Sequence, residues 1–288
     1  MKLGIGTVQF GLNYGISNFS GKVKKKDAKK ILDTGFNFRI DTIDTANNYG
    51  ESEVILGKLN FKQTKIITKI SISNKKNLNT EISIKKKIEN SLRKLNRKTL
   101  YGVLIHNPKQ LKKYHYQSIN KVINNLKKNG VIKKFGISIY NSKDLSKILK
   151  KISIDIIQIP INLFDRRMEK SGWLKKLKHK GIEIHARSIF LQGLLLLPKS
   201  KIPKKFLRYK KLFKDWYNWL DSNHEVTSKE ACISYIKSLS EIDKIIIGFN
   251  SVSEIKEIIK IYKSKKKIFP DISSNEKLLL EPQNWEKL

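Results

Sequence analysis

Cysteine is almost absent from this sequence, and long apolar runs do not occur in it. The single cysteine, Cys232, excludes an internal disulfide framework and a metal site built from cysteines. No stretch approaches the roughly 18–20 apolar residues that a membrane-spanning helix needs. The start of the chain, MKLGIGTVQFG, is a poor signal peptide because a lysine and glycines interrupt its short apolar stretch. We therefore expect a cytoplasmic protein without a membrane span.

Acidic residues and arginines are also scarce. The chain has 25 acidic and 60 basic residues, a net charge of +35, and only seven of the basic residues are arginines. Base readout in nucleic acids favours the bidentate fork of arginine and a single basic face. The lysines are instead spread over nearly every expected helix, as in SIKKKIENSLRKLNRK. We interpret them as solvated faces and expect no specific nucleic-acid partner.

Hydrophobic residues make up 39% of the 288 residues, enough for one large barrel or two ordinary domains. Short, β-branched runs alternate with stretches of helical period, several of which stop at a glycine (Gly35, Gly130, Gly181). Their nearly continuous apolar content is typical of strands buried on both faces. The eight runs lie at residues 3–9, 38–44, 65–70, 100–106, 133–139, 154–161, 182–188 and 244–249.

Eight such units predict an α/β fold, a (β/α)8 TIM barrel that forms a single domain over residues 1–288. A doubly wound open sheet is the alternative, but GIGTVQFG lacks the third glycine of a dinucleotide fingerprint. An extended loop, about residues 190–227, follows the seventh strand and contains RYKKLFKDWYNWLDS, which we expect to form a helix over one end of the barrel. In the C-terminal tail, Trp285 is expected to pack on the barrel wall.

Chemistry in such barrels is carried at the C-terminal ends of the strands. Three consecutive predicted strands end in ionisable residues, Asp44, Lys69 and His106, and Tyr49 follows the first of them closely. One such residue alone would be interpreted as structural, whereas three directed at the same mouth indicate an active site. The residues at or near the eight predicted strand ends are Gln9, Asp44, Lys69, His106, Ser138, Gln158, Ser188 and Gly248.

These residue types suit proton transfer to a carbonyl oxygen. A phenol has a pKa near 10, and an adjacent ammonium lowers such a value by roughly 1–3 units. On this argument Lys69 acidifies Tyr49, Asp44 keeps Lys69 charged and in place, and His106 polarises the carbonyl oxygen or relays a proton. Gly50 lets the loop after Tyr49 turn sharply. No paired ligand spacing indicates a metal site.

The segments DTANNYGESE, ITKI and LIHNP stand in the order and strand context of the aldo-keto reductase signatures. The chain resembles that family over nearly its whole length. The resemblance implies an oxidoreductase that uses NADPH, with NADH as the alternative, and reduces a small aldehyde or ketone. Its catalytic tetrad would be Asp44, Tyr49, Lys69 and His106. GTVQFGLNYGISN and ARSIFLQGLLL look most like a bacterial branch linked to surface-polysaccharide synthesis, which suggests a sugar-derived carbonyl.

The resemblance also implies cofactor contacts. Arg187 replaces a stacking tyrosine, and its planar guanidinium can stack on a ring or form a salt bridge to a neighbouring loop. Asn250 follows Gly248 closely, where NADPH-preferring members usually carry a basic residue. The implied cofactor contacts are Thr7, Ser138, Gln158, Arg187, Ser188, Leu191, Gly193, Gly248, Asn250 and Ser251. The alternative to a reductase is a non-catalytic nucleotide-binding regulator, which would have no need of an intact tetrad. The oligomeric state is left open.

Overall fold

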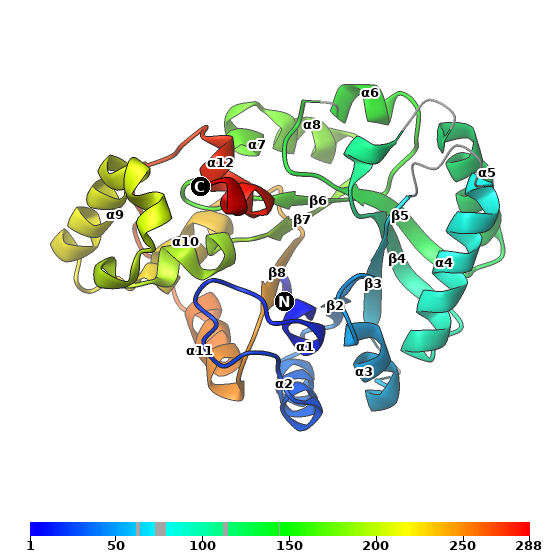
Figure 1. The fold of residues 1–288 in the computed structure, drawn as a ribbon, viewed down its shortest axis with the longest axis horizontal. Helices are drawn as coiled ribbons and strands as arrows, with labels where there is room; N and C mark the ends of the chain where they lie inside the picture. The colour runs from blue at the N-terminus through cyan, green and yellow to red at the C-terminus, as the bar shows by residue number, and fades with distance from the viewer. Residues whose placement is uncertain (62–63, 73–78, 112–114, 144) are drawn as a thin grey trace.

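Eight parallel strands close into a barrel in the order β1 to β8, so the predicted (β/α)8 TIM barrel is confirmed (Figure 1). The computed structural model of the protein describes residues 1–61, 64–72, 79–111, 115–143 and 145–288. Residues Ile5 and Ile247 lie in register where β1 pairs with β8 to close the barrel. The strands are β1 (Leu3–Gly6), β2 (Thr42–Asp44), β3 (Lys65–Ile70), β4 (Leu100–Ile105), β5 (Ile132–Ser138), β6 (Ile156–Pro160), β7 (Glu183–Arg187) and β8 (Lys244–Gly248).

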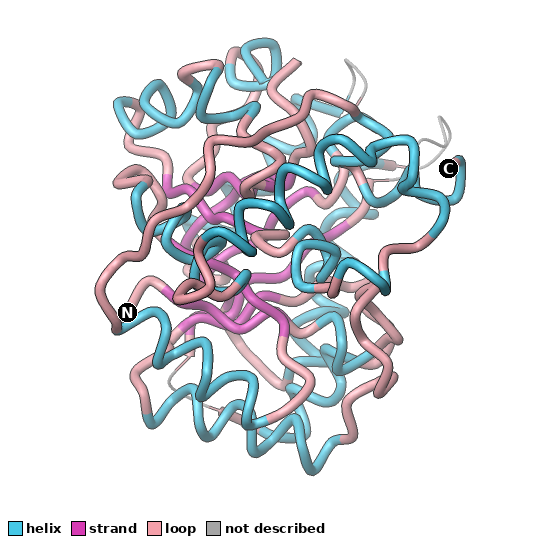
Figure 2. Tube along the Cα trace, turned by 90° about the vertical axis from the view of Figure 1, so that its left-hand side faces the viewer, coloured by secondary structure: helices cyan, strands magenta, loops and turns pink. Residues whose placement is uncertain are grey.

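Helices surround the strands, which lie in the interior of the molecule in Figure 2. The α-helices are α1 (Val8–Gly11), α2 (Lys25–Asn37), α3 (Ser52–Leu59), α4 (Thr80–Leu95), α5 (His115–Lys128), α6 (Leu145–Leu149), α7 (Arg167–Lys170), α8 (Trp173–His179), α9 (Lys210–Ser222), α10 (Ser228–Ser238), α11 (Val252–Lys263) and α12 (Lys277–Leu280). Short 3-10 helices are η1 (Pro108–Gln110), η2 (Leu191–Leu196), η3 (Lys199–Lys201), η4 (Lys204–Tyr209) and η5 (Pro282–Lys287).

Two of the three predicted glycine stops are correct. Gly130 and Gly181 follow α5 and α8 with φ of 68° and 69°, the left-handed conformation that glycine adopts at low cost. Gly35 instead lies inside α2, and the chain takes the left-handed conformation at Arg39, where φ is 61°. A Cβ on Gly35 would lie 2.6 Å from Cδ1 of Ile5, so this glycine allows α2 to pack closely on β1.

Six of the eight strands are shorter than predicted, β2 by four residues and β1 and β6 by three each. The run at residues 3–9 ends as a strand at Gly6, and Gln9 lies in α1 rather than at a strand end. The backbone N–H of Leu12 donates to the carbonyl of Val8, which turns this apolar segment into a helical turn. α2 ends at Asn37, and the backbone N–H groups of residues 38–40 donate to carbonyls of its last turn, so β2 is only Thr42–Asp44. Apolar content alone did not separate these turns from the strands.

The barrel interior is layered along its axis. Lys65, Ile67 and Lys69 occupy alternate positions of β3 and therefore project to the same side. Ile67 packs with Leu104 and Ile156 in a small apolar cluster, separate from the main core. The N-terminal layer holds ion pairs, which link Lys65 and Lys244 to Asp41 and Lys134 to Glu183. The C-terminal layer carries Lys69 and the other candidate site residues.

The segment after β7 contains the predicted helix, α9, which Figure 1 shows at the edge of the molecule. Its Phe213 and Trp216 are buried, as ordinary packing predicts. Trp285 is buried as predicted, but its contacts are with the loop after β7 and with the tail rather than with the barrel wall: its ring lies 5.1 Å from that of Phe206 in η4, and its Nε1 donates to the carbonyl of Leu279 in α12 at 2.9 Å.

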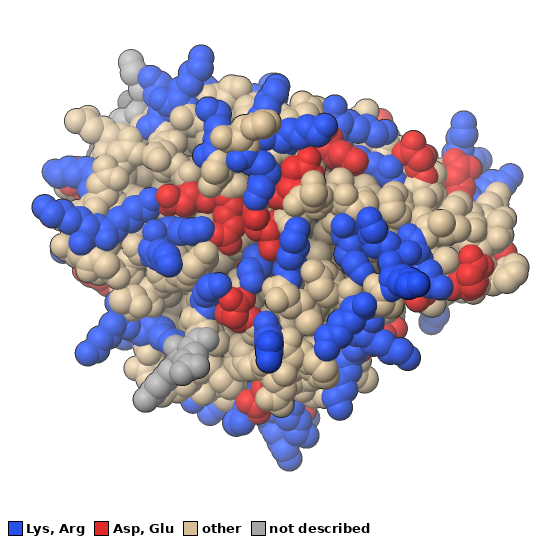
Figure 3. Space-filling view, turned by 180° about the vertical axis from the view of Figure 1, so that it is seen from behind, with Lys and Arg blue, Asp and Glu red and all other residues tan. Residues whose placement is uncertain are grey.

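Basic side chains are spread over the surface and do not form one face. Figure 3 shows lysines and arginines across the whole visible side, with acidic residues between them. Many lysines are paired with carboxylates, such as Lys22 with Glu51 at 3.0 Å and Lys229 with Glu257 at 2.6 Å. This distribution agrees with the interpretation of the lysines as solvated faces.

Candidate active site

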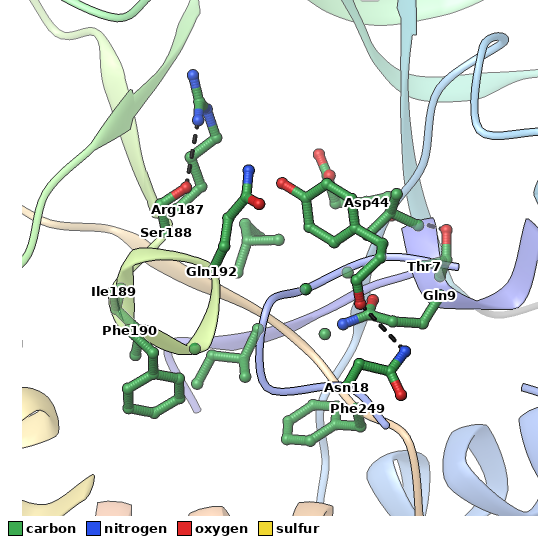
Figure 4. Close-up of a pocket in the computed structure, with 18 of the residues that line it drawn as sticks. Thr7, Gln9, Asn18, Asp44, Arg187, Ser188, Ile189, Phe190, Gln192 and Phe249 are labelled. Carbon is green, nitrogen blue, oxygen red and sulfur yellow. Dashed lines mark hydrogen bonds between the residues drawn. The ribbon is translucent and has the colours of Figure 1, made fainter. Parts of the chain in front are cut away.

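A cavity of about 430 Å³ opens at the C-terminal ends of the strands. This volume is typical of small-molecule and cofactor sites. Figure 4 shows Asp44 and Thr7 on one side of the cavity and Arg187, Ser188 and Gln192 on the other. The lining residues come from the loops after several strands, as expected for a barrel of this class.

The structure brings the four residues of the predicted tetrad together. Nζ of Lys69 lies 2.5 Å from Oδ2 of Asp44 and 3.3 Å from the hydroxyl of Tyr49. The rings of Tyr49 and His106 meet edge to face, with centroids 5.7 Å apart. Asp44, Tyr49 and His106 line the cavity. Lys69 is fully buried, so it reaches the cavity only through the side chains of Asp44 and Tyr49.

A close approach of two backbone segments holds Tyr49 in place. The backbone N–H of Tyr49 donates to the carbonyl of Ala46, and Gly50 follows with φ of 53°, which agrees with the predicted sharp turn. A Cβ on Gly11 would lie 1.7 Å from the carbonyl oxygen of Tyr49. Only glycine at this position of α1 allows the helix to lie directly against the turn that carries the phenol.

The electrostatic effect on Tyr49 is opposite to the one expected from the sequence. Burial raises the pKa of Tyr49 above its ordinary value, the carboxylate of Asp44 raises it further, and the guanidinium of Arg187 only partly opposes this. The ammonium of Lys69 does not acidify the phenol because Asp44, 2.5 Å away, already balances its charge. Burial also lowers the pKa of Lys69, against the opposing effect of Asp44. Tyr49 is therefore a protonated phenol at neutral pH.

His106 is a neutral imidazole at the same pH. Burial lowers its pKa to about 3, and the positive charges of Lys69 and Arg187 act in the same direction. Its Nδ1 is buried and has no hydrogen-bond partner among the described residues. A neutral imidazole in this position can donate one hydrogen bond to a ligand in the cavity.

Three buried amide oxygens also lack partners in the described part of the chain. Nε2 of Gln158 donates to Oδ1 of Asp44 at 2.7 Å, which leaves Oε1 of Gln158 unpaired. Oε1 of Gln9 and Oδ1 of Asn250 are unpaired as well, and all three residues line the cavity. Buried acceptors of this kind are costly unless a ligand or water donates to them. The cavity therefore fits a ligand with several N–H and O–H donors, as a nicotinamide dinucleotide has.

The predicted cofactor contacts divide into two groups. Ser138, Leu191 and Ser251 are not among the residues that line the cavity. Ser138 and Leu191 are buried, and the hydroxyl of Ser251 accepts a hydrogen bond from the backbone N–H of Glu254 as the N-cap of α11. The seven that do line it are Thr7, Gln158, Arg187, Ser188, Gly193, Gly248 and Asn250.

Arg187 stacks on a protein ring. Its guanidinium lies 4.4 Å from the centroid of the Tyr140 ring and donates to the carbonyl of Ile139 at 3.1 Å and to Oγ of Ser188 at 3.3 Å. No carboxylate of a described residue forms an ion pair with it. The alternative of a salt bridge to a neighbouring loop is therefore wrong within the part of the chain that the structure describes.

Several lining residues were missed because they lie in loops or at the starts of helices whose position relative to the cavity the sequence does not determine. Tyr14 carries a signal that could have identified it, since Asn-Tyr-Gly occurs both at residues 13–15 and at residues 48–50. The missed residues include Tyr14, Tyr140, Gln192, Lys229, Glu254, Pro282 and Gln283. Among the described residues, no cluster of three potential ligands could hold a metal ion, and no helix is both long and apolar enough to cross a bilayer.

Comparisons with known proteins agree with this fold. The family model for the aldo/keto reductase family matches residues 2–273. The "Uncharacterized oxidoreductase YqkF" of Bacillus subtilis (strain 168) is 26% identical over 266 residues, 85% of each chain. The holo form of aldo-keto reductase AKR11C1 from Bacillus halodurans has a TM-score of 0.73 at 18% identity, over 96% of this chain and 94% of that one.

A second solved structure, the glycerol dehydrogenase AKR11B4 from Gluconobacter oxydans, has a TM-score of 0.67 at 20% identity and covers 92% of this chain and 87% of that one. At such identities the two structures show the fold, while the family model and the curated relative cover most of the sequence itself. The chain therefore belongs to the aldo/keto reductase family, and it is an NAD(P)-dependent oxidoreductase.

Proposed function

We propose that the protein reduces a small aldehyde or ketone, such as a sugar-derived carbonyl, with Tyr49 as the proton donor. The observation that carries this proposal is the position of the Tyr49 hydroxyl, 3.3 Å from Nζ of Lys69 and on the wall of the cavity. Burial and Asp44 hold the pKa of Tyr49 high, so the proton stays on the phenol until a substrate accepts it. Residues 1–288 would act as one domain.

Each residue of the tetrad has a distinct role in this proposal. Tyr49 donates its proton to the carbonyl oxygen as the nicotinamide cofactor, when bound, supplies a hydride to the carbonyl carbon. Nζ of Lys69 donates a hydrogen bond to the Tyr49 hydroxyl oxygen at 3.3 Å, which orients the phenol so that its proton faces the carbonyl oxygen. Asp44 fixes Lys69, and His106, a neutral imidazole, donates a hydrogen bond to the carbonyl oxygen.

The unpaired amides would hold the cofactor. Gln158 and Gln9 offer acceptors near the strand ends, and Asn250 offers one beside the N-terminus of α11. Backbone N–H groups at such a terminus favour phosphate. Arg187 would contribute a cation close to Tyr49 and His106.

The β8–α11 end of the cavity favours NADH, the alternative to the NADPH implied by the resemblance. Glu254 lines this end, and its carboxylate accepts a hydrogen bond from the backbone N–H of Asn250 at 2.7 Å. Lys229 also lines it, but its ammonium is paired with Glu257 at 2.6 Å. A carboxylate accepts hydrogen bonds from ribose hydroxyls and repels the additional phosphate of NADPH.

The decisive experiment compares the wild type with Tyr49→Phe in the oxidation of NADH and NADPH by a panel of small aldehydes. We expect the variant to lose at least about a hundredfold in kcat/KM, the usual scale of general acid catalysis. Fluorescence titration should show that it still binds the cofactor, with NADH bound more tightly than NADPH. Tyr209→Phe is a matched control, because the Tyr209 hydroxyl lies outside the cavity lining and has no partner among the described residues.

Two results would contradict the proposal. Turnover by Tyr49→Phe at the wild-type rate would remove the assigned proton donor. Tight cofactor binding by the wild type without turnover of any carbonyl compound would favour the non-catalytic regulator. Tighter binding of NADPH than of NADH would refute only the assignment of Glu254.

A further inference from the structure

Arg187 is a cation on the cavity wall whose hydrogen-bonding capacity is only partly used. It ends β7 and is half-buried. A guanidinium has five N–H donors. In this structure one donates to the carbonyl of Ile139 and one to Oγ of Ser188, and both acceptors are uncharged. The remaining donors have no partner among the described residues.

The reacting end of the cavity carries an unbalanced positive charge. Its carboxylate, that of Asp44, already accepts hydrogen bonds from Lys69 at 2.5 Å and from Gln158 at 2.7 Å. The other acidic residue of the lining, Glu254, belongs to the β8–α11 end. Lys69 and Arg187 therefore face a single carboxylate among the described residues. A half-buried charge without a partner is unfavourable, and a bound anion would remove that cost.

The guanidinium is also held in a fixed orientation. The ring of Tyr140 lies against it at 4.4 Å, and the carbonyl of Ile139 fixes one edge. A planar fork held in this way matches the two oxygens of a carboxylate or phosphate better than a mobile ammonium does. Its charge acts on the reacting residues, because it contributes to lowering the pKa of both Lys69 and His106.

We infer that Arg187 binds an anionic group of the substrate, so that the enzyme reduces aldehydes or ketones that carry a carboxylate or phosphate. This inference rests on the proposed function, since Tyr49 must protonate the carbonyl oxygen of the same molecule. Arg187 then determines specificity: its fork holds the anion while the carbonyl group lies at Tyr49 and His106.

The test uses pairs of substrates in which one member carries an anionic group that the other lacks or has esterified. A benzaldehyde with a para carboxylate is compared with its methyl ester, and glyceraldehyde phosphate with glyceraldehyde. For each pair, kcat/KM is measured for wild type, Arg187→Met and Arg187→Lys, and the cofactor dissociation constant is measured by fluorescence. Arg208→Met removes the same charge from an exposed position outside the cavity lining and serves as the control.

We expect the wild type to prefer the anionic member of at least one pair, and the pair that shows this distinguishes carboxylate from phosphate. Arg187→Met should reduce that preference by about 10- to 100-fold, the scale of a hydrogen bond to a charged group. The preference of Arg187→Lys for the anionic substrate should fall between those of the wild type and Arg187→Met, because lysine keeps the charge but not the fork. Arg208→Met should retain the wild-type ratio.

The inference is overturned if the wild type shows no charge preference, or if Arg187→Met and Arg187→Lys both keep the wild-type ratio. Weaker cofactor binding with an unchanged ratio would assign Arg187 to the cofactor instead. Each of these results leaves the proposed reduction intact as long as the neutral substrates are turned over. Absence of turnover with every substrate would overturn the proposed function and this inference together.

Discussion

His106 links the active site to the stability of the protein at low pH. Burial, together with the charges of Lys69 and Arg187, lowers its pKa from 6.5 to about 3. Between these two values the unfolded chain binds a proton at this residue and the folded protein does not. The contribution of His106 to the free energy of unfolding therefore rises with pH in that window and is fully present above pH 6.5. It is lost as the pH falls toward 3.

We predict that the wild type loses more stability on acidification than His106→Gln. The difference should approach about 1.4 kcal/mol per pH unit below the unfolded pKa, the value for one proton. Urea unfolding of both proteins at a series of pH values measures this difference directly. Other buried groups contribute equally to both proteins. If the free energies of unfolding of the two proteins fell in parallel as the pH is lowered below 6.5, His106 would take up a proton in the folded state as readily as in the unfolded chain.

At the scale of the residue, the sequence predicted which side chains meet but not how they influence one another. Asp44, Lys69 and His106 could be identified because each stands at or near a predicted strand end. The shift in the Tyr49 pKa could not, because it depends on burial and on the 2.5 Å contact that neutralises Lys69. Such distances are set by packing across strands, which residue order does not encode.

At the scale of the element, one carboxylate links the C-terminal tail to the segments that follow three of the strands. Glu281 precedes η5 and is only 2% exposed. It pairs with Nη1 of Arg167 at 3.3 Å and Nζ of Lys109 at 3.7 Å, and accepts from Nδ2 of Asn141 at 3.3 Å. These partners lie on the segments that follow β6, β4 and β5. The next residue, Pro282, lines the cavity, so Glu281 positions part of the cavity wall.

We predict that Glu281→Gln raises KM for the carbonyl substrate with a smaller change in kcat. The free energy of unfolding should fall by about 1–3 kcal/mol, because a buried hydrogen-bonded charge is lost. The loss is limited because Arg167 remains paired with Asp165 at 2.8 Å. Glu286→Gln, at an exposed position of the same tail, is the control. Steady-state kinetics and urea unfolding of both variants test this; an unchanged KM would show that the tail is held in place without Glu281.

The elements themselves were predicted well where the chain is regular and poorly where it turns. All eight strands and helix α9 follow from apolar patterning, whereas the early end of β1 and the short β2 do not. The path of the tail was also not predictable, because it depends on the contacts of Glu281 with three segments that are far apart in the sequence. Long-range ion pairs of this kind leave no periodic signal in the sequence.

At the scale of the whole molecule, the dominant feature is the excess of 60 basic over 25 acidic residues. Each surface ion pair contributes little to stability, and many lysines must face other lysines rather than carboxylates. Figure 3 shows these cations distributed across the surface. Folding brings them closer together than they are in the unfolded chain, so net repulsion opposes folding.

We therefore predict that added salt stabilises the protein. Salt weakens the favourable ion pairs as well as the repulsion, but the charge of +35 makes repulsion the larger effect. The melting temperature should rise as sodium chloride is increased from low ionic strength to about 0.15 M, where the screening length is about 8 Å. An uncharged osmolyte at matched osmolality is the control, because it leaves charge repulsion unscreened. A melting temperature that falls with salt would mean that attraction in networks such as Lys65–Asp41–Lys244 outweighs the repulsion. The positions of the lysines relative to carboxylates, rather than their number, would then determine the effect of charge on stability.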